Sequence, residues 1–160
     1  MQGSQKRRGE KMLIVIAEKE ELKLVEELGY GDFPILITGV GGMNVIQALK
    51  DLPRNTTILN IGYAGSNNLP IGTKVAVNTC QTNRETANFG EGGGLLGTFD
   101  FPKGFVRCPC YTSTDFVTHT NKKESCVFDM ELAFIWALFD NVSAIKVVSD
   151  NLSYKEFKGE

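Results

Sequence analysis

One stretch near the C-terminus decides the fold, and it reads FDMELAFIWALF at 128–139 and AIKVVSD at 144–150. The first half is apolar on every face apart from Glu131, which predicts a buried helix with Asp129 as its N-cap. The second half is rich in β-branched residues and predicts a buried strand that ends at Asp150. Because α/β sheets bind ligands at the carboxyl ends of their strands, we expect a binding site around these carboxylates.

The composition is that of one domain with a small-molecule partner. The chain has 160 residues, of which 42% are hydrophobic, and a formal net charge of -2 with acidic and basic residues interspersed. This length predicts a single core. The charge pattern contains no cluster of basic residues of the kind that binds nucleic acid or an anionic membrane. No apolar run approaches the roughly 20 residues of a membrane helix. We therefore expect a cytoplasmic protein that binds neither nucleic acid nor membranes.

The first eleven residues differ in character from the rest of the chain. They are polar and contain glycine, and the first apolar run begins directly after them. They also lack the apolar stretch of a signal peptide. We predict a disordered leader at 1–11, followed by a single domain at 12–160.

Alternating apolar runs and helical patterns predict an α/β fold. Three buried strands are expected at 12–17, 34–38 and 57–61. The other expected elements are helices over 18–29 and 44–49, an antiparallel or edge strand over 72–80, and short strands over 105–111, 114–118 and 125–128. Small residues at 62–65 are expected to end the third strand in a turn. A long glycine-rich segment at 81–104 is expected to be a loop.

The glycine turn after the second strand invites a dinucleotide-binding interpretation, which the spacing does not support. Gly39 and Gly41 are present, but Asn44 stands where the fingerprint needs its third glycine. The glycines favour close approach of backbone amides to a ligand instead. No cofactor is expected.

Cysteine and histidine usage indicates neither a metal site nor histidine-dependent nucleophilic chemistry. The four cysteines, Cys80, Cys108, Cys110 and Cys126, include one close pair and no second pair at zinc spacing, so we predict buried free thiols. His119 is the only histidine. A Ser-His or Cys-His mechanism would need it, yet no nucleophile motif accompanies it.

Several patches, taken in chain order, resemble one family. They read AEKEEL at 17–22, TGVG at 38–41, NIGYAG at 60–65, FDME at 128–131 and VVSD at 147–150. The first patch is similar to a family motif of an alanine followed by a methionine and three glutamates. The second and third patches are similar to the family's two glycine turns, the fourth to its Val-Glu-Met-Glu motif and the fifth to its Ile-Ser-Asp motif. These belong to the nucleoside phosphorylase and hydrolase superfamily, and the nearest branch is the 5'-methylthioadenosine/S-adenosylhomocysteine nucleosidases. The resemblance implies a three-layer α-β-α fold with a mixed central sheet, in shortened form.

The resemblance also implies a reaction. It is hydrolysis of the N-glycosidic bond of a purine nucleoside such as 5'-methylthioadenosine or S-adenosylhomocysteine, which releases adenine. Members of this branch act in methionine salvage, need no cofactor and are commonly homodimers. The purine, the 5'-substituent and a role on futalosine or another nucleoside stay open.

The family pattern implies catalytic roles for three residues. Asp150 would be the general acid that protonates N7 of adenine, with Ser149 orienting it, and such an acid needs a pKa raised toward neutrality. Glu21 would hold or activate the attacking water, and Glu20 is its substitute if the alignment slips by one. Because Glu21 follows one strand, Asp150 ends another and Glu131 opens a helix, the carboxylates are expected to converge at one sheet edge.

Other positions would bind the substrate. Glu131 would accept hydrogen bonds from the ribose hydroxyls, and Phe116 would stack on the purine. The full implied set is Glu131, Met130, Phe116, Val117, Tyr63, Gly41 and Tyr154, with no metal ligand. Tyr154 belongs to Leu152-Ser153-Tyr154, which stands in for the Leu-Ser-Phe of the family's 5'-alkylthio pocket.

Two alternatives stay open. A purine nucleoside phosphorylase would need arginines and a serine for phosphate, but here the first turn is acidic, Arg54 is only loosely placed and Tyr63 replaces the small hydroxyl residue. A carboxylate base suits a neutral water better, so hydrolysis is favoured. The second alternative is a non-catalytic nucleoside-binding relative, because the chain is shorter than the family norm both after Cys80 and after Asp150.

Overall fold

The structure is a computed structural model that describes residues 12–85, 92–97, 101 and 103–153. The predicted leader at 1–11 and Tyr154 lie outside these residues. The described strands are β1 (Met12–Ile16), β2 (Ile35–Ile37), β3 (Thr57–Ser66), β4 (Lys74–Thr82), β5 (Gly93–Leu95), β6 (Val106–Thr112), β7 (Val127–Asp129) and β8 (Asn141–Asp150). The described helices are the 3-10 helix η2 (Lys19–Glu21), α1 (Leu22–Glu27), α2 (Gly42–Leu49) and α3 (Leu132–Leu138).

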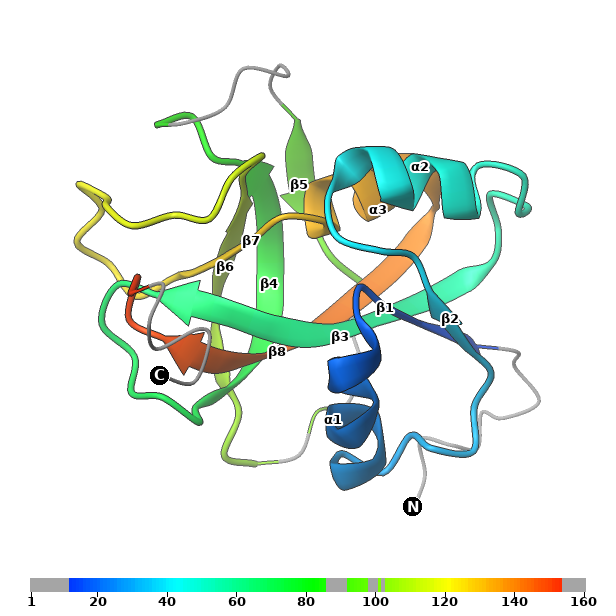
Figure 1. The fold of residues 1–160 in the computed structure, drawn as a ribbon, viewed down its shortest axis with the longest axis horizontal. Helices are drawn as coiled ribbons and strands as arrows, with labels where there is room; N and C mark the ends of the chain where they lie inside the picture. Colours follow the sequence, from blue (N-terminus) through cyan, green and yellow to red (C-terminus); the bar gives the residue numbers. More distant parts are fainter. Residues whose placement is uncertain (1–11, 86–91, 98–100, 102, 154–160) are drawn as a thin grey trace.

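All eight strands belong to one mixed sheet, and five of them pair in a closed circuit. β3 pairs with β8 in parallel, β8 with β4 antiparallel, β4 with β6 in parallel, β6 with β7 in parallel, and β7 with β3 antiparallel. β2 and β1 extend the sheet from β3, and β5 extends it from β4. The sheet therefore curls back on itself, which Figure 1 shows as β4, β6 and β7 rising beside the long β3 and β8.

The length of β3 makes this circuit possible. β1 pairs only with positions 57–60 of β3, which leaves the far half of that edge without a partner from β1. β7 takes that half, pairing Phe128 with Gly65. The register of β3 against β8 also shifts between Ala64 and Gly65, and such a bulge bends and twists a strand. β3 thus links the open part of the sheet to the closed part.

Helices cover both faces of the β1–β3–β8 part of the sheet, which gives the expected three layers (Figure 1). On one face, Leu24 and Val25 of α1 pack with Ile14 and Ile61. On the other face, Leu49 of α2 and Leu132 and Ile135 of α3 pack with the alternate side chains of the same strands, including Val15 and Ile58. The alternation of β-strand side chains thus divides the apolar residues between two cores. The predicted α/β class with a mixed central sheet is confirmed.

Several predicted elements differ from the structure. The small residues at 62–65 lie inside β3 and do not form a turn, so the strand continues to Ser66. The segment predicted as a strand at 114–118 forms none. β4 is bordered by β5, β6 and β8 and is not an edge strand, although it does run antiparallel to β8. The predicted loop at 81–104 contains the end of β4 and the short strand β5.

The C-terminal helix is shorter and less buried than its sequence predicts. It begins at Leu132, and its N-cap is Glu131 rather than Asp129. Asp129 still contributes from β7, because its Oδ2 accepts a hydrogen bond from Leu132 N at 2.8 Å. Ala137 is exposed and Trp136 is half-buried, so only one side of α3 faces the core. No helix among the described residues is long and apolar enough to cross a membrane.

Candidate active site

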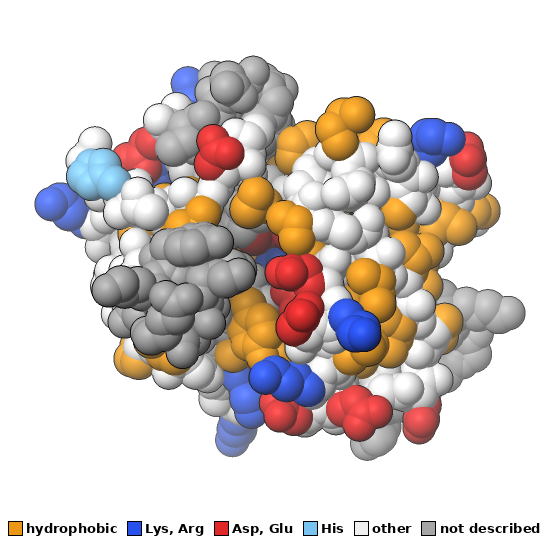
Figure 2. Space-filling view, in the orientation of Figure 1, with side chains coloured by type: hydrophobic (Ala, Val, Ile, Leu, Met, Phe, Trp, Pro, Cys, Tyr) orange, Lys and Arg blue, Asp and Glu red, His pale blue; other side chains and the backbone are white. Residues whose placement is uncertain are grey.

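A cavity of about 330 Å³ opens between the ends of β3, β7 and β8 and the 3-10 helix that follows β1. This volume lies within the range of roughly 300–1,000 Å³ that is usual for small-molecule sites. Figure 2 shows the hollow near the centre of the face, with acidic side chains beside it. The described residues that line it include the carboxylates of Glu18, Glu21, Asp115, Asp129, Glu131 and Asp150, and no lysine or arginine.

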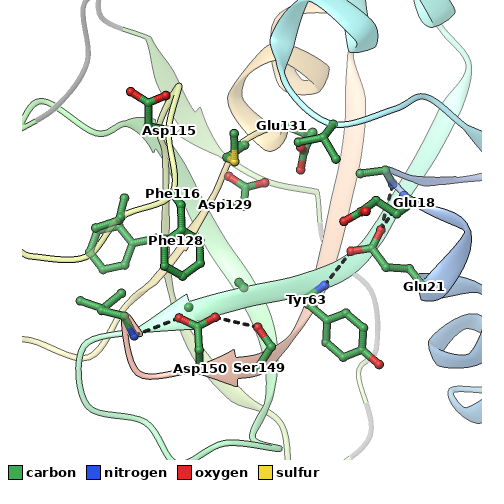
Figure 3. A pocket seen from close by; sticks show the side chains of 17 residues that line it. Glu18, Glu21, Tyr63, Asp115, Phe116, Phe128, Asp129, Glu131, Ser149 and Asp150 are labelled. Atoms are coloured by element: carbon green, nitrogen blue, oxygen red, sulfur yellow. Dashed lines mark hydrogen bonds between the residues drawn. The ribbon is translucent and has the colours of Figure 1, made fainter. Parts of the chain in front are cut away.

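Figure 3 shows two ends of this cavity. Phe116 and Phe128 lie above Asp150 at one end, and Glu18, Glu21 and Glu131 gather at the other. Glu21, Glu131 and Asp150 come from three separate parts of the chain. The predicted convergence of Glu21, Glu131 and Asp150 in one pocket is confirmed.

Asp150 is the last residue of β8, and its side chain is fully buried. Its Oδ1 accepts a hydrogen bond from Ser149 Oγ at 2.8 Å, and its Oδ2 accepts one from Leu152 N at 2.9 Å. Both bonds are drawn in Figure 3. The carboxyl group is therefore held in one orientation at the cavity wall, next to the serine that the sequence pairs with it.

Two glycines of β3 make room for the carboxylates. A Cβ on Gly62 would lie 2.8 Å from Glu21 Oε2, and a Cβ on Gly65 would lie 2.8 Å from Asp150 Oδ2. Neither glycine has a positive φ, so their role is close approach and not backbone freedom. Within the segment expected to end the strand, Gly62 leaves space for the Glu21 carboxylate and Gly65 leaves space for the Asp150 carboxyl group.

Glu21 is the last residue of η2, the short helix that follows β1, and its carboxylate accepts three backbone hydrogen bonds. Oε1 accepts hydrogen bonds from Ala17 N at 2.9 Å and Glu18 N at 3.2 Å. Oε2 accepts one from Tyr63 N at 3.0 Å. These bonds join the end of β1 to the middle of β3 and fix the buried carboxylate at one end of the cavity.

Glu131 lies in the turn between β7 and α3, and its carboxylate reaches the glycine turn after β2. Its Oε2 accepts a hydrogen bond from Gly41 N at 2.8 Å. Gly41 has a φ of 91°, a left-handed conformation that glycine adopts without strain and that turns its N–H toward the carboxylate. Burial and then the negative charge of Asp129 raise the pKa of Glu131 to about 7. This carboxyl group therefore titrates near neutral pH.

A buried ion pair lies beneath this turn. Lys146 Nζ is 3.0 Å from Asp129 Oδ2, and both side chains are almost completely enclosed. Burial alone would raise the pKa of Asp129, but the Lys146 charge and the hydrogen bond from Thr112 outweigh it and lower that pKa. Burial alone would likewise lower the pKa of Lys146, but Asp129 and the neighbouring acidic groups raise it. The pair is ionised.

The remaining predicted residues occupy the following places. Ser149, Met130, Phe116, Val117 and Tyr63 all line the cavity. The Tyr63 ring packs against the α1-side core, so this residue meets the acidic end through its backbone N–H. Gly41 contributes through its bond to Glu131, and its neighbour Val40 lines the cavity. Tyr154 lies outside the described residues.

Sequence reasoning missed several members of the site. Glu18, Asp115 and Phe128 line the cavity, and Asp129 does so in addition to accepting the hydrogen bond from Leu132 N. Leu152, which the family resemblance places in the 5'-alkylthio pocket, also lines it. Lys146 was not singled out, because a single lysine in a β-branched run is ordinarily on the solvent side of a strand. The sequence did offer a signal for Phe128 and Asp129. They stand just before Glu131, the residue predicted to bind the ribose, and therefore close to the site.

The cysteines and the histidine lie apart from this chemistry. Cys80, Cys108, Cys110 and Cys126 are buried free thiols, as predicted. Burial raises the pKa of the Cys80 and Cys108 thiols to about 12, which keeps them protonated. His119 is exposed and is not among the lining residues. Within the described part of the chain, no group of three or more His, Cys, Asp or Glu side chains is arranged to hold a metal ion.

Comparison with known proteins identifies the fold. No family model and no curated protein sequence matches the chain. Solved structures do match it, and they include 5'-methylthioadenosine/S-adenosylhomocysteine nucleosidases from several organisms. The enzyme from Chlamydia trachomatis bound to adenine has a TM-score of 0.73 at 18% identity, over 94% of this chain and 88% of the other.

Two other comparisons agree. The S. pneumoniae enzyme with a transition-state inhibitor has a TM-score of 0.68 at 16% identity, over 92% of this chain and 90% of the other. The Neisseria meningitidis enzyme with methylthio-immucillin-A has a TM-score of 0.67 at 18% identity, over 93% and 91%. At these identities the likeness is one of fold. The chain has the fold of the 5'-methylthioadenosine/S-adenosylhomocysteine nucleosidases.

Proposed function

We propose that this protein hydrolyses the N-glycosidic bond of a purine nucleoside such as 5'-methylthioadenosine or S-adenosylhomocysteine and releases adenine. The observation that carries the proposal is the convergence of Glu21, Glu131 and Asp150 in one cavity that also contains Phe116. Similar folds hold related ligands, since neighbouring structures from Chlamydia trachomatis are bound to adenine or to methylthioadenosine.

The end of the cavity with Asp150 suits the base. Cleavage leaves electrons on the purine, so the reaction needs a proton donor at N7, and general acid catalysis contributes about 10²–10⁴-fold. Asp150 is buried and is oriented by Ser149, which are the surroundings that such an acid needs. Phe116 and Val117 offer apolar surface for the faces of a flat ring.

The opposite end suits the sugar and the water. Glu131, fixed by Gly41 N, would accept hydrogen bonds from the 2'- and 3'-hydroxyls, with Met130 against the ring. Glu21 lies beside it and would hold or activate the attacking water. The acidic groups at this end also stabilise the positive charge that develops on the sugar as the bond to the base breaks.

Charge favours hydrolysis over phosphorolysis. The described residues that line the cavity include six carboxylates and no lysine or arginine, so a phosphate dianion would be repelled. Arg54 pairs with Asp140 at 2.8 Å, with both side chains largely exposed, and it is not a lining residue. A neutral water molecule carries no such penalty.

One observation favours the non-catalytic alternative. Three backbone donors already occupy much of the accepting capacity of the Glu21 carboxylate. Little of that capacity is left for an attacking water molecule. The protein would then bind a nucleoside without cleaving it.

Three further expectations belong to this proposal: a homodimer, a cytoplasmic location and a place in methionine salvage. The homodimer is supported by the exposed apolar side chains of Met43 and Ile46 on α2, next to Val40 at the cavity. Exposed apolar side chains grouped beside a binding site favour a protein partner. A second copy seated there would cover the cavity mouth.

The proposal is tested by incubating the intact protein with 5'-methylthioadenosine and separating the products by chromatography. We expect adenine and methylthioribose in equal amounts, at a rate that inorganic phosphate does not increase. Phosphate-dependent formation of the sugar 1-phosphate would favour the phosphorylase. Calorimetric binding without any adenine release would favour the binding protein.

Gly65→Ala tests the close approach at the base end. The new Cβ would lie 2.8 Å from Asp150 Oδ2 and 3.2 Å from Leu152 Cδ2, so the carboxyl group must move. Because misplacing a reacting group by about 1 Å can cost 10²-fold, we expect kcat for adenine release to fall about 10- to 100-fold.

The matched control is Gly31→Ala, whose Cβ would meet nothing closer than 3.6 Å. We expect this variant to keep the wild-type rate. Full activity of Gly65→Ala in the same assay would show that Asp150 does not act from the position described.

A further inference from the structure

Lys146 is a buried charge that the proposed reaction does not use. It lies in the middle of β8, and only 1% of its surface is exposed. Its neighbours along the strand on the same face, Ala144 and Val148, belong to the apolar core beneath α2 and α3. Burying an ammonium group in such surroundings is costly unless partners compensate for the lost water.

The first partner, Asp129, connects Lys146 to the turn that carries Glu131. Asp129 Oδ2 lies 3.0 Å from Lys146 Nζ and also accepts a hydrogen bond from Leu132 N at 2.8 Å. Asp129 Oδ1 accepts one from Thr112 Oγ1 at 2.6 Å, and Thr112 Oγ1 in turn accepts one from Ala133 N at 3.0 Å. These bonds hold both ends of the two-residue turn at Met130 and Glu131.

The second group of partners lies at the sugar end of the cavity. Lys146 is the register partner of Gly62, and a Cβ on that glycine would be 3.5 Å from Lys146 Nζ and 2.8 Å from Glu21 Oε2. The ammonium and the Glu21 carboxylate are therefore close neighbours over one glycine. Glu131 and Asp129 lower the energy of the charged lysine in the same way, and Cys110 on β6 also faces it. The Lys146 ammonium group thus interacts with the carboxylates of Asp129, Glu131 and Glu21.

We propose that Lys146 is a positioning residue for the sugar end of the site: through Asp129 it fixes the turn that carries Glu131, and its charge balances the carboxylates of Glu21 and Glu131. The inference rests on the proposed function for its meaning in catalysis. The arrangement itself is a property of the free protein.

The charges around Glu131 give the expected direction of each change. Glu131 faces Asp129 on β7, Lys146 on β8 and Glu21 on η2, and it accepts a hydrogen bond from Gly41 N. Glu18 and Asp150 line the same cavity. Removing the cation raises the pKa of Glu131, and removing the Asp129 charge lowers it, because the two act with opposite sign.

The experiment is a titration of the Glu131 carboxyl carbon by ¹³C NMR in the free protein, with Glu131→Gln to assign the signal. We expect the midpoint to rise by about one pH unit or more in Lys146→Met and to fall in Asp129→Asn. Lys146→Arg keeps the charge and is expected to restore the wild-type midpoint. Ile145→Ala is the control, since Ile145 is as buried as Lys146 but faces the other core.

Thr112→Val tests whether the hydrogen bonds around Asp129 fix the turn that carries Glu131, and it changes no charge. It removes the hydrogen bonds to Asp129 and from Ala133, so we expect KM for the nucleoside to rise about 10-fold while kcat changes less. This variant is nearly isosteric and keeps the test available if Lys146→Met does not fold.

The outcomes separate this inference from the proposed function. An unchanged Glu131 midpoint in Lys146→Met and Asp129→Asn, or an unchanged KM in Thr112→Val, overturns the positioning role. The expected midpoint shifts in a protein that releases no adenine would support the role of Lys146 and overturn the reaction instead.

Discussion

Replacing Asp150 by Asn is expected to lower kcat for adenine release by about 10²–10⁴-fold, which is the usual contribution of a general acid. The amide has nearly the shape of the carboxyl group, and its oxygen can still accept the hydrogen bond from Leu152 N. It cannot give up a proton to the leaving base. The loss should therefore appear in kcat, with the affinity for adenine changed much less.

Two measurements check this expectation. Steady-state rates are compared with calorimetric binding of adenine for the wild type, Asp150→Asn and Ser149→Ala. The serine variant loses only the bond to Asp150 Oδ1 and is expected to show a smaller decrease in kcat. An Asp150→Asn variant that kept a tenth or more of the wild-type kcat would show that the proton comes from another group.

Replacing Glu131 by Gln is expected to weaken nucleoside binding about 10- to 100-fold. Hydrogen bonds to charged groups contribute about 1.5–3 kcal/mol each, and the neutral amide would lose that strength toward the ribose hydroxyls. The expected change is a rise in KM at pH 8, where the wild-type carboxyl group is ionised. Near pH 5, where it is protonated, the two proteins should differ much less.

The same variant is expected to be more stable than the wild type at high pH. The folded-state pKa of Glu131 is about 7, above its ordinary value of 4.5, so the folded protein binds more protons than the unfolded chain between these values. Stability therefore falls as the pH rises through this window, by an amount on the order of 3 kcal/mol. Gln has no charge to bury, so Glu131→Gln should lack this fall.

Urea unfolding at pH 5 and pH 8 measures the effect. The control is Glu27→Gln, an exposed position on α1 whose charge does not lie in the cavity. The prediction would be wrong if the free energies of unfolding of the wild type and Glu131→Gln differed by the same amount at both pH values. Ionisation of the buried Glu131 carboxyl group would then not destabilise the folded protein.

Much of the fold was predictable because its elements are locally encoded. The apolar run at 12–16 and the β-branched run before Asp150 predict buried strands that the structure contains. The helix after β1 follows from apolar residues at helical spacing with a glycine after them, and the helix after β2 follows from the glycine turn that precedes it. The closed circuit of strands was not predictable in this way, because it depends on pairings such as Phe128 with Gly65, which are far apart in sequence.

The site shows the same division. Glu21, Glu131 and Asp150 were predicted because each stands at the end of an element and matches a family motif. The function of the segment 62–65 was misjudged, since small residues end strands in many proteins and here they leave space for Glu21 and Asp150. Lys146 was missed because a sequence pattern does not reveal which buried position has carboxylates around it.

A crystal structure of the protein with adenine bound tests the central claim most directly, because the whole account depends on one cavity in which distant carboxylates meet around one base and one sugar. The account predicts that the purine lies between Asp150 and Phe116, with N7 toward the Asp150 carboxyl group and the sugar position open toward Glu131 and Glu21. Adenine bound elsewhere, or bound here with N7 turned away from Asp150, would contradict it.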